Sequence, residues 1–344
     1  MSRIPARFPT APPTLADVAE LAGVSRQTVS NAVNNPELLR PDTLARVQDA
    51  ISELGYSPNR AARNLRTRSS HLIGLKFNPA QENTANAAMD RFVHTLVETS
   101  GETGYHVLLF SGTPDDPVGG YDDLLKSTAV DAFIVTDTYL GNPQAAWLTS
   151  KRAPFVAFGR PWDDPDASYP WVDVDGAAGT RLATDHLLDK GHTRIAWIGW
   201  RRDSFIGEDR RSGWTRAMHD RDLSTTGLAS RVEDTIASGR EAAAVLLDEA
   251  RPTAFVCASD TLAVGVLHTL GDRGIHWGKD IAVVGFDDSQ VSQVVPGGLT
   301  SVRQPLEQVA VELVKALEGL LSTPPVAGPG VLLTPTLAVR LSSG

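Results

Sequence analysis

The chain has one cysteine and eight scattered histidines in 344 residues, and both shortages restrict its chemistry. Because Cys257 has no second cysteine to pair with, the chain can form no internal disulfide and no CxxC metal or redox site. It stands in the apolar run AFVCAS and is expected to be a small buried hydrophobic residue. The histidines show neither HExxH nor Cys/His ligand spacing. The sequence therefore predicts no metal site and no cofactor.

Long apolar runs are also missing. The first residues, MSRIPARFPTAPPT, contain prolines and arginines without the apolar stretch of a secretion signal. No later run has the length of a membrane span. We therefore expect a cytoplasmic protein that does not bind a membrane, with residues 1–13 disordered.

Motifs of several enzyme classes are absent as well. There is no GxSxG elbow, no GxGxxG after a strand and no GxxxxGK phosphate-binding loop. Adjacent acids occur three times, at Asp115 and Asp116, Asp163 and Asp164, and Asp287 and Asp288. Two carboxylates can hydrolyse a glycosidic bond only when they flank it, which neighbours on one loop do not do. An α/β enzyme or a secreted sugar-binding protein remains an alternative that these patterns disfavour.

What the chain does have is enough apolar material for two or three domains, with 42% hydrophobic residues in 36.8 kDa. Its charge is distributed unevenly. The net charge is −9, but residues 1–70 carry +3 and the remainder carries −12. A basic head on an acidic body can place one end against DNA while the other end is repelled from it.

The residues from Thr14 to Asn34 predict two short helices joined by a tight turn at Gly23. Thr14 and Ser25 are suited to cap the two helices, whose apolar residues recur at helical spacing. The exposed face of the second helix is polar and suits base edges in the major groove. Its residues are Arg26, Gln27, Ser30, Asn31 and Asn34. The pattern favours a DNA-reading helix-turn-helix, and a helical hairpin that only packs is the alternative.

Two further segments follow this hairpin. Asp42 is suited to cap a third helix, DTLARVQDAISELGY, whose apolar side would cover the first two. Ser57 is suited to cap a fourth segment, PNRAARNLRTRSS, with Pro58 in its first turn. From Ser57 to Ser70 there are four arginines and no acid. This favours contact with a phosphate backbone.

The run from Leu15 to Gly74, with VAELAGVSRQTVSNAVN, ISELGYSPNRAARNL and HLIGL, resembles the headpiece and hinge of the LacI/GalR family of bacterial transcription repressors. The resemblance implies that Arg26 and Gln27 read bases, since Arg suits guanine and Gln suits adenine. The family often has Arg where this chain has Asn31, which points to an altered operator preference.

The same resemblance implies further DNA contacts to backbone and groove walls. They are assigned to Thr14, Ser25, Ser30, Tyr56 and Asn59. Thr28 and Asn34, in the second helix, are also predicted to contact DNA. Leu65 would be the hinge leucine, which enters the minor groove as an apolar wedge and kinks the duplex. An ordinary helix contact is the alternative for this leucine. A hinge helix of about ten residues is too short to be stable alone, so DNA and a partner subunit would order it.

From His71 onward, strands alternate with helices, which predicts parallel sheets covered on both faces. The segments DHLLDKGHTRIAWIG, RRSGW, ASDTLAVG, IAVVGFDDS and LTSVRQP resemble the periplasmic sugar-binding fold that this family carries as its sensor. The predicted fold is therefore an all-α helix-turn-helix headpiece and hinge helix, followed by a bilobed α/β body of two doubly wound parallel sheets.

The expected domains are a headpiece at 14–56, a hinge at 57–70 and an effector-binding and dimerisation body at 71–344. By resemblance, the body crosses between its lobes near Val172, Thr300 and Gly330. The N-lobe would contain about 71–172 and 301–329, and the C-lobe about 173–300 and 330–344. VLLTPTLAV is predicted as a single last strand.

Ligands of open α/β sheets bind beyond the carboxyl ends of the strands. This rule selects residues that follow predicted strands, namely Asn78, Asp137, Arg160, Trp162, Asp173, Trp200, Asp260 and Asp287. The resemblance implies that Arg210, in RRSGW, holds an effector and that Asp260, in ASD, is its acidic ligand. An inter-lobe ion pair or a helix N-cap is the alternative for these two. Tryptophans suit stacking on a sugar, and an arginine with an aspartate suits paired hydroxyls.

The combined prediction is a nucleoid-associated repressor that binds a palindromic operator as a homodimer and is released by a small carbohydrate. A regulator that needs its ligand to bind DNA, with a phosphosugar or nucleobase as that ligand, is the alternative.

Overall fold

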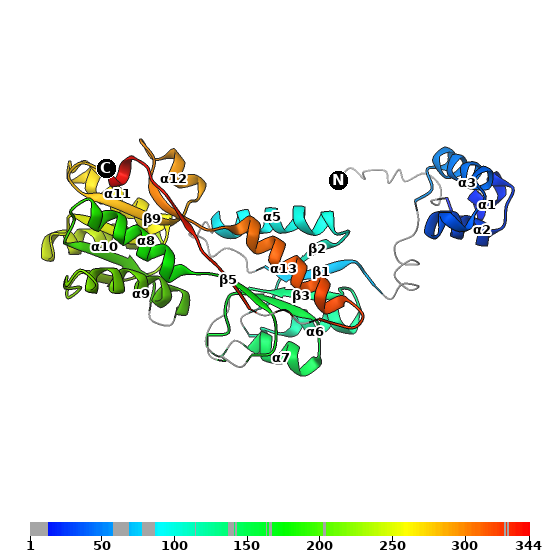
Figure 1. Cartoon of the computed structure of the whole chain (residues 1–344), viewed down its shortest axis with the longest axis horizontal. Coiled ribbons are helices and arrows are strands. Elements are labelled where there is room, and N and C mark those ends of the chain that lie inside the picture. Colours follow the sequence, from blue (N-terminus) through cyan, green and yellow to red (C-terminus); the bar gives the residue numbers. More distant parts are fainter. Residues whose placement is uncertain are drawn as a thin grey trace, which may run out of the picture. The chain divides into compact units, whose positions relative to one another are not determined.

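The computed structural model describes residues 13–57, 69–77, 87–113, 115–136, 141, 143–162, 164, 167–201, 204–326, 328 and 330–344. The chain divides into two compact units, Met1–Ser70 and His71–Gly344 (Figure 1). Within the described residues, no helix combines the length and apolar character needed to cross a membrane.

The first unit is a bundle of short helices. They are α1 (Leu15–Ala22), α2 (Arg26–Asn34), the 3₁₀ turn η1 (Pro36–Leu38) and α3 (Pro41–Leu54). Thr14 caps α1 in a capping box with Asp17, and Ser25 caps α2 by accepting the Thr28 amide at 3.1 Å. Gly23 ends α1 in the left-handed conformation, at φ 63°. The helix-turn-helix predicted from the sequence is confirmed.

The third helix begins differently from the prediction. Asp42 was expected to cap it, but the N-cap residue is Arg40, whose side chain makes no capping bond. Pro41 is the first helical residue, because its fixed φ suits that position and its missing N–H would have had no partner there. The three helices enclose one small core. Its buried members are Val18, Ala19, Ala22, Val29, Ala32, Val47, Ala50 and Tyr56. The predicted hinge helix falls mostly on residues 58–68, outside the described residues.

The second unit contains two sheets, each at the centre of one lobe. The N-lobe sheet has the order β11-β5-β4-β3-β1-β2, and all its pairs are parallel. Its strands are β1 (Leu72–Lys76), β2 (His106–Phe110), β3 (Ala132–Val135), β4 (Phe155–Phe158), β5 (Trp171–Val174) and β11 (Val331–Leu333). Its helices are α5 (Ala87–Glu102), α6 (Gly119–Lys126), α7 (Pro143–Lys151) and α13 (Leu306–Leu321). Figure 1 shows α5 and α13 side by side along this lobe.

Alternation along the strands divides the N-lobe core into two layers. Ile134 belongs to the cluster that α5 and α13 complete, whereas its neighbours Phe133 and Val135 pack with Tyr121 of α6 and Leu148 of α7. Successive side chains of a strand point to opposite faces, so one strand supplies both layers. All five are fully buried.

The C-lobe sheet has the order β12-β10-β9-β8-β6-β7. Its strands are β6 (Ile195–Gly199), β7 (Ala229–Arg231), β8 (Ala254–Cys257), β9 (Ala282–Asp287), β10 (Thr300–Arg303) and β12 (Thr336–Ala338), and only β12 runs antiparallel to its neighbour. Its helices are α8 (Gly176–Asp189), α9 (Phe205–His219), α10 (Ile236–Glu249), α11 (Asp260–Asp272), α12 (Gln290–Val294) and the 3₁₀ turn η2 (Leu341–Ser343). Cys257 is fully buried in this core, as expected.

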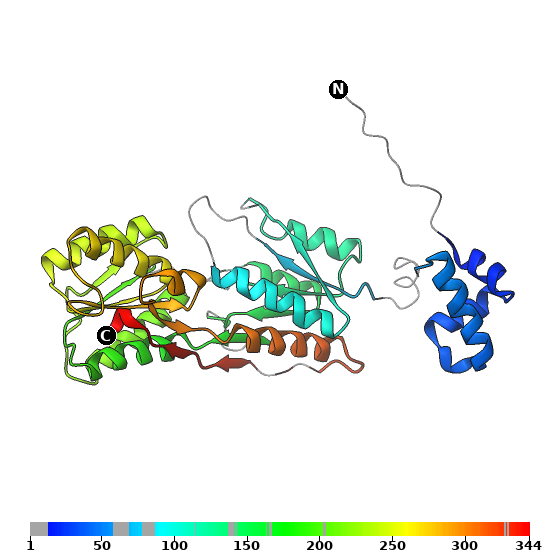
Figure 2. The same ribbon diagram turned by 90° about the horizontal axis from the view of Figure 1, so that it is seen from above.

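The sheets place the crossings between lobes later in the chain than the sequence indicated. The N-lobe strand β5 runs to Val174, and all of β10 pairs within the C-lobe, so the second crossing follows Arg303. The predicted last strand is two strands, with β11 in the N-lobe sheet and β12 in the C-lobe sheet (Figure 2). The third crossing therefore lies between them, at Pro335, which cannot donate to either ladder.

Candidate functional site

The first candidate surface is the polar face of α2. Arg26 and Gln27 are exposed in its first turn, while Asn31 is half-buried one turn later. The Gln27 amide donates to Asn31 Oδ1 at 3.0 Å, which orients both side chains along the helix. Asn34 donates to the Ser30 carbonyl oxygen at 2.6 Å. The residues predicted to read DNA therefore share one face, with Arg26 and Gln27 the most accessible of those in the helix.

The other predicted DNA contacts have different settings. Thr14 and Ser25 serve as helix caps, and Ser25 Oγ also lies 2.9 Å from Thr28 Oγ1. Tyr56 is 9% exposed and packs in the headpiece core, and burial raises the pKa of its hydroxyl above the ordinary value. Asn59 and Leu65 lie outside the described residues.

The second candidate site is a cavity of about 270 Å³ where the two lobes of the body meet. Several lining residues stand at the carboxyl ends of parallel strands, as the rule for open α/β sheets requires. Thr136 follows β3, Gly159 follows β4, Trp200 follows β6, Asp287 ends β9 and Gln304 follows β10. Of the residues predicted to line the pocket, the cavity brings together Trp162, Asp173, Trp200, Arg210 and Asp287, while Asn78 and Asp137 lie outside the described residues.

Arg210 is the buried cation of this cavity, with 6% exposure. Its guanidinium carbon lies 3.6 Å from the ring centroid of Phe286 and 4.8 Å from that of Trp200. Arg210 Nη1 donates to the Ala258 carbonyl oxygen at 2.5 Å. Its Nε is buried and has no partner among the described residues. Burial lowers the pKa of Arg210. The guanidinium therefore has donor capacity that its bonds to Ala258 and Asp287 do not use.

Asp287 is the acidic counterpart of Arg210. Its Oδ1 lies 3.5 Å from Arg210 Nη1 and accepts a bond from the Gln304 amide at 2.7 Å. Burial raises the pKa of Asp287 to about 6, against the lowering effect of Arg210. The side chain is thus an acceptor that is ionised at neutral pH and lies next to an unsatisfied donor. Such a pair can take two adjacent hydroxyl groups.

Arg160 approaches the cavity from the N-lobe but bonds to its walls. Arg160 Nε donates to Asp173 Oδ2 at 2.6 Å, and its Nη2 donates to Asp209 Oδ2, on α9 of the C-lobe, at 3.1 Å. The guanidinium also lies 4.3 Å from the ring centroid of Trp162, which stacks on Phe205 of the C-lobe. The Trp162 ring is therefore engaged by protein groups, while its indole N–H is buried without a partner among the described residues.

The structure places Asp260 away from the cavity lining. It is 2% exposed at the first turn of α11, and it accepts bonds from the Ser289 amide at 2.7 Å and from Ser301 Oγ at 2.6 Å. Burial raises the pKa of Asp260 to about 7, and nearby Asp287 adds to this effect. The helix N-cap is Ser259, not Asp260. In this structure the Asp260 carboxylate holds the turn after β9.

Sequence reasoning missed several residues that line the cavity. Asp234 follows β7, a polar three-residue strand that gave no recognisable pattern. Gln304 directly follows the predicted strand LTSVRQ, so the strand-end rule could have found it. Asp209 precedes Arg210 on α9 and was overlooked because only Arg210 matched a motif. Within the described residues, no cluster of His, Cys, Asp or Glu could hold a metal ion.

Comparison with known proteins matches both the headpiece and the body to families. The model for bacterial regulatory proteins of the lacI family matches residues 14–59, and the model for a periplasmic binding protein-like domain matches residues 184–343. The HTH-type transcriptional regulator CelR of Thermobifida fusca is 35% identical over 314 residues, covering 89% of this chain and 91% of the relative. The chain belongs to the LacI family. It is a DNA-binding transcriptional regulator, as its sequence predicted.

Other members of the LacI family match nearly the whole length. The ribose operon repressor of Escherichia coli strain K12 is 29% identical, covering 96% of this chain and 99% of that protein. A structure of the lac repressor dimer bound to operator has a TM-score of 0.82 at 27% identity, covering 97% of this chain and 99% of that one. A CelR–cellobiose complex has a TM-score of 0.73 at 32% identity, covering 96% and 99%. The predicted fold class is confirmed.

Proposed function

We propose that this LacI-family chain is a dimeric repressor that a small uncharged sugar releases from a two-fold symmetric operator. The observation that carries the sugar assignment is the pairing of Arg210 and Asp287 inside the cavity. The unsatisfied Arg210 Nε and the Asp287 carboxylate together offer a donor and an acceptor for adjacent hydroxyls. The similar CelR–cellobiose complex and the similar ribose operon repressor support this class of ligand, because both are named for a sugar.

The charge of the cavity favours a neutral ligand over a phosphorylated one. The described lining residues include four aspartates and one arginine, and Arg210 is already next to Asp287. The aspartates are Asp173, Asp209, Asp234 and Asp287. A phosphate group would enter this acidic lining against like charge, since nearby opposite charges are what stabilise an anion.

The unpartnered indole N–H groups also favour a sugar as the ligand. Trp162 and Trp200 line the cavity, and their Nε1 atoms are buried without a described partner. A buried donor without a partner costs free energy, so a ligand that brings an acceptor gains by satisfying it. Sugar hydroxyls can accept from these donors. The rings themselves lie against Arg160 and Arg210, so we assign them hydrogen bonding more than stacking on the ligand.

A thermal-shift screen tests the ligand assignment. A ligand that binds only the folded state increases the free energy of unfolding by RT ln(1 + [L]/Kd), and this raises the unfolding temperature. We expect cellobiose or ribose to stabilise the full chain, and glucose 6-phosphate and guanine to have no effect. Stabilisation by glucose 6-phosphate alone would support the alternative of a phosphosugar-responsive regulator.

For DNA binding, we assign base reading to Arg26 and Gln27 and a shift of operator preference to Asn31. Gln27 and Asn31 are hydrogen-bonded, so a change at either would alter the other. One headpiece reads only a few base pairs, which is why a partner subunit at about one helical turn is needed for tight binding. Thr14, Ser25, Thr28, Ser30, Asn34, Tyr56 and Asn59 would contact backbone or groove walls.

The remaining assignments follow from this function. Leu65 is proposed as the minor-groove wedge of the hinge at 57–70, between the headpiece at 14–56 and the body. Leu65→Ala should weaken specific operator binding without changing sugar affinity, and unchanged operator affinity would exclude the wedge. The chain has no enzymatic role in this proposal, and it acts in the bacterial cytoplasm, where its DNA lies.

A further inference from the structure

Two consecutive aspartates occupy the turn that follows β9. Asp287 has φ 106° and Asp288 has φ 48°, a region of backbone space that favours glycine. Residues with side chains stay in such conformations only where the surroundings hold them, and these cases concentrate at ligand sites and switch regions. The contacts of the two carboxylates show what holds this turn.

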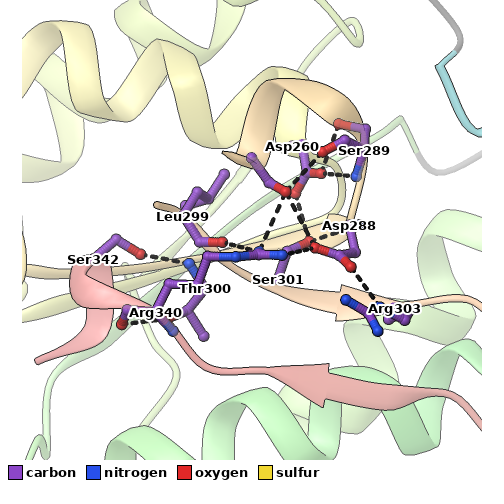
Figure 3. Close-up of polar contacts among 10 residues, drawn as sticks. Asp260, Asp288, Ser289, Leu299, Thr300, Ser301, Arg303, Arg340 and Ser342 are labelled. Carbon is purple, nitrogen blue, oxygen red and sulfur yellow. Dashed lines mark hydrogen bonds and ion pairs between the residues drawn. The ribbon is translucent and has the colours of Figure 1, made fainter. Parts of the chain in front are cut away.

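The two carboxylates have different partners. Asp287 lines the cavity, next to Arg210 and bonded to Gln304. The Asp288 side chain is 1% exposed, and it accepts from Arg303 Nε and from Arg340 Nη2, each at 2.5 Å (Figure 3). The cavity thus contacts one residue of the turn while two arginines contact the other.

The partners of this turn stand at two crossings between the lobes. Arg303 ends β10 and Gln304 follows it, at the start of the second crossing. Arg303 bonds to Asp288 and Gln304 bonds to Asp287. Arg340 follows β12, the strand that comes directly after the third crossing. Arg340 also donates to the Leu299 carbonyl oxygen at 2.6 Å, next to the start of β10. The turn after β9 therefore connects the cavity to both crossings.

A buried network of hydrogen bonds also holds the turn after β9. The Asp288 amide donates to Ser301 Oγ at 2.9 Å, and Ser301 Oγ donates to Asp260 Oδ1. Asp260 Oδ2 accepts from both the amide and the hydroxyl of Ser289 (Figure 3). Buried polar networks of this kind, when every member is satisfied, hold one arrangement rigidly. The turn that contains Asp287 and Asp288 is therefore held in place on the side of Ser301 and Asp260.

We propose that Asp288 is a positioning residue for the effector response, which transmits the state of the cavity to the second and third crossings through Arg303 and Arg340. Asp288 does not line the effector cavity, and its effect passes through the peptide it shares with Asp287. A ligand that changes the bonds of Asp287 shifts this shared turn. The bonds of Asp288 to Arg303 and Arg340, at the two crossings, then change as well. The inference rests on the proposed function for the identity of the ligand.

The first experiment measures coupling in the full chain. The operator is selected from a random duplex pool by the wild-type protein, and cellobiose is the probe. The operator Kd is measured with and without saturating cellobiose, and the cellobiose Kd is measured without DNA. Allosteric coupling in proteins is typically about 5- to 150-fold. We expect Asp288→Asn to reduce the coupling to about twofold or less while changing the cellobiose Kd by less than about threefold.

Two further variants separate positioning from general damage. Arg303→Gln removes one of the two arginine partners of Asp288. Because the Arg303 side chain is half-exposed, the fold should stay intact and the coupling should be reduced only partly. Asp248→Asn is a control for the loss of an exposed aspartate–arginine pair in the C-lobe, because it removes a partner of Arg273 far from the crossings in sequence. Full coupling in Asp288→Asn, or equal losses of coupling in Asp288→Asn and Asp248→Asn, would overturn the proposal.

The second experiment needs no ligand, so it separates this inference from the proposed function. Hydrogen exchange of the free full chain is followed in peptides covering residues 336–341, which the turn reaches through Asp288 and Arg340. Asp287→Asn should accelerate exchange there, and it should add nothing in an Asp288→Asn background. If Asp287→Asn leaves these amides unchanged, the transmission is disproved. If cellobiose does not bind the wild type, that sugar is excluded, and the exchange result decides the role of Asp288.

Discussion

We assign the two activities of this regulator to the polar face of α2 and to the cavity between the lobes, and these two sites are constructed in opposite ways. On α2, the key side chains come from one nine-residue helix and face solvent, and their described partners are within that helix. In the cavity, the side chains come from segments up to about two hundred residues apart and are held by buried contacts. The first surface can be altered one residue at a time, whereas a change in the second leaves buried partners unsatisfied.

The largest effect is expected from Arg210→Ala, which tests the cavity side of this comparison. Arg210→Ala removes the buried donors assigned to the ligand. It also leaves the Asp287 charge buried without its partner, and breaking a buried charge pair costs about 3–5 kcal/mol. Arg210→Ala should therefore abolish the sugar response in thermal-shift and operator-release assays while operator binding persists. Arg216→Ala, on the exposed face of the same helix, is the control. A normal sugar response in Arg210→Ala would exclude the cavity assignment.

The next effect is expected on the α2 side. A bidentate contact from arginine to guanine discriminates against a wrong base by about 1–3 kcal/mol. Arg26→Ala should therefore weaken binding to the selected operator and relax the preference at one base pair, with sugar affinity unchanged. Fluorescence anisotropy on the operator and on single-base variants measures both. If Arg26→Ala weakened all sequences equally, Arg26 would contact phosphate instead of a base.

Acidification should affect the cavity more than α2. The pKa of Asp287 is raised to about 6 by burial, so the carboxylate is ionised at pH 7 and becomes protonated as the pH falls below 6. A protonated Asp287 loses the acceptor that a sugar hydroxyl needs. Sugar affinity should fall by about tenfold between pH 7 and pH 5, as calorimetry would show. The decline should disappear in Asp287→Asn, whose affinity is low at every pH.

The stability of the ligand-free body should change with pH in the opposite direction to sugar affinity. Asp287 and Asp260 have pKa values raised to about 6 and about 7 in the folded state, above their ordinary value of 3.8. The folded chain therefore retains protons that the unfolded chain has released, and stability falls as the pH rises from about 4 to about 7. Asp260→Asn should flatten part of this slope in denaturant unfolding. A slope as steep as that of the wild type would contradict the raised pKa of Asp260.

The smallest effect is expected at the start of the headpiece. Thr14 and Asp17 form a reciprocal capping box, in which Asp17 Oδ2 accepts the Thr14 amide at 2.7 Å. Thr14→Ala should destabilise the headpiece by about 1 kcal/mol. Thr14→Ser keeps the hydroxyl and should restore most of the loss. Equal melting of the two variants, followed by circular dichroism, would mean that the cap contributes nothing.

Local features explain why α2 was predictable. The caps Thr14 and Ser25, the left-handed turn at Gly23 and the apolar spacing of α1 and α2 are all written within about twenty residues. The third helix shows the limit of such reasoning, because Asp42 and Pro41 are neighbouring start signals and the structure uses the proline. The resemblance to the LacI family supplied the roles of these residues, which spacing alone does not contain.

The cavity shows where local reasoning fails. The strand-end rule found Trp200 and Asp287, because each stands at the carboxyl end of a strongly apolar strand. It selected Asp260 as well, yet that carboxylate bonds to Ser289 and Ser301 instead of lining the cavity. Asp234 was missed because β7 is short and polar.

The sequence by itself determined the helix-turn-helix and the alternation of strands and helices, since each rests on local patterns. Its resemblance to the LacI family selected Arg210 for the effector site. Only the tertiary structure decided that β11 and β12 belong to different sheets and that Asp287 and Asp288 have different partners. The physical reason is that sheet order and carboxylate partners depend on contacts between distant segments. Residues such as Arg340 and Asp288 meet across 52 positions of the chain. No local periodicity records such a meeting.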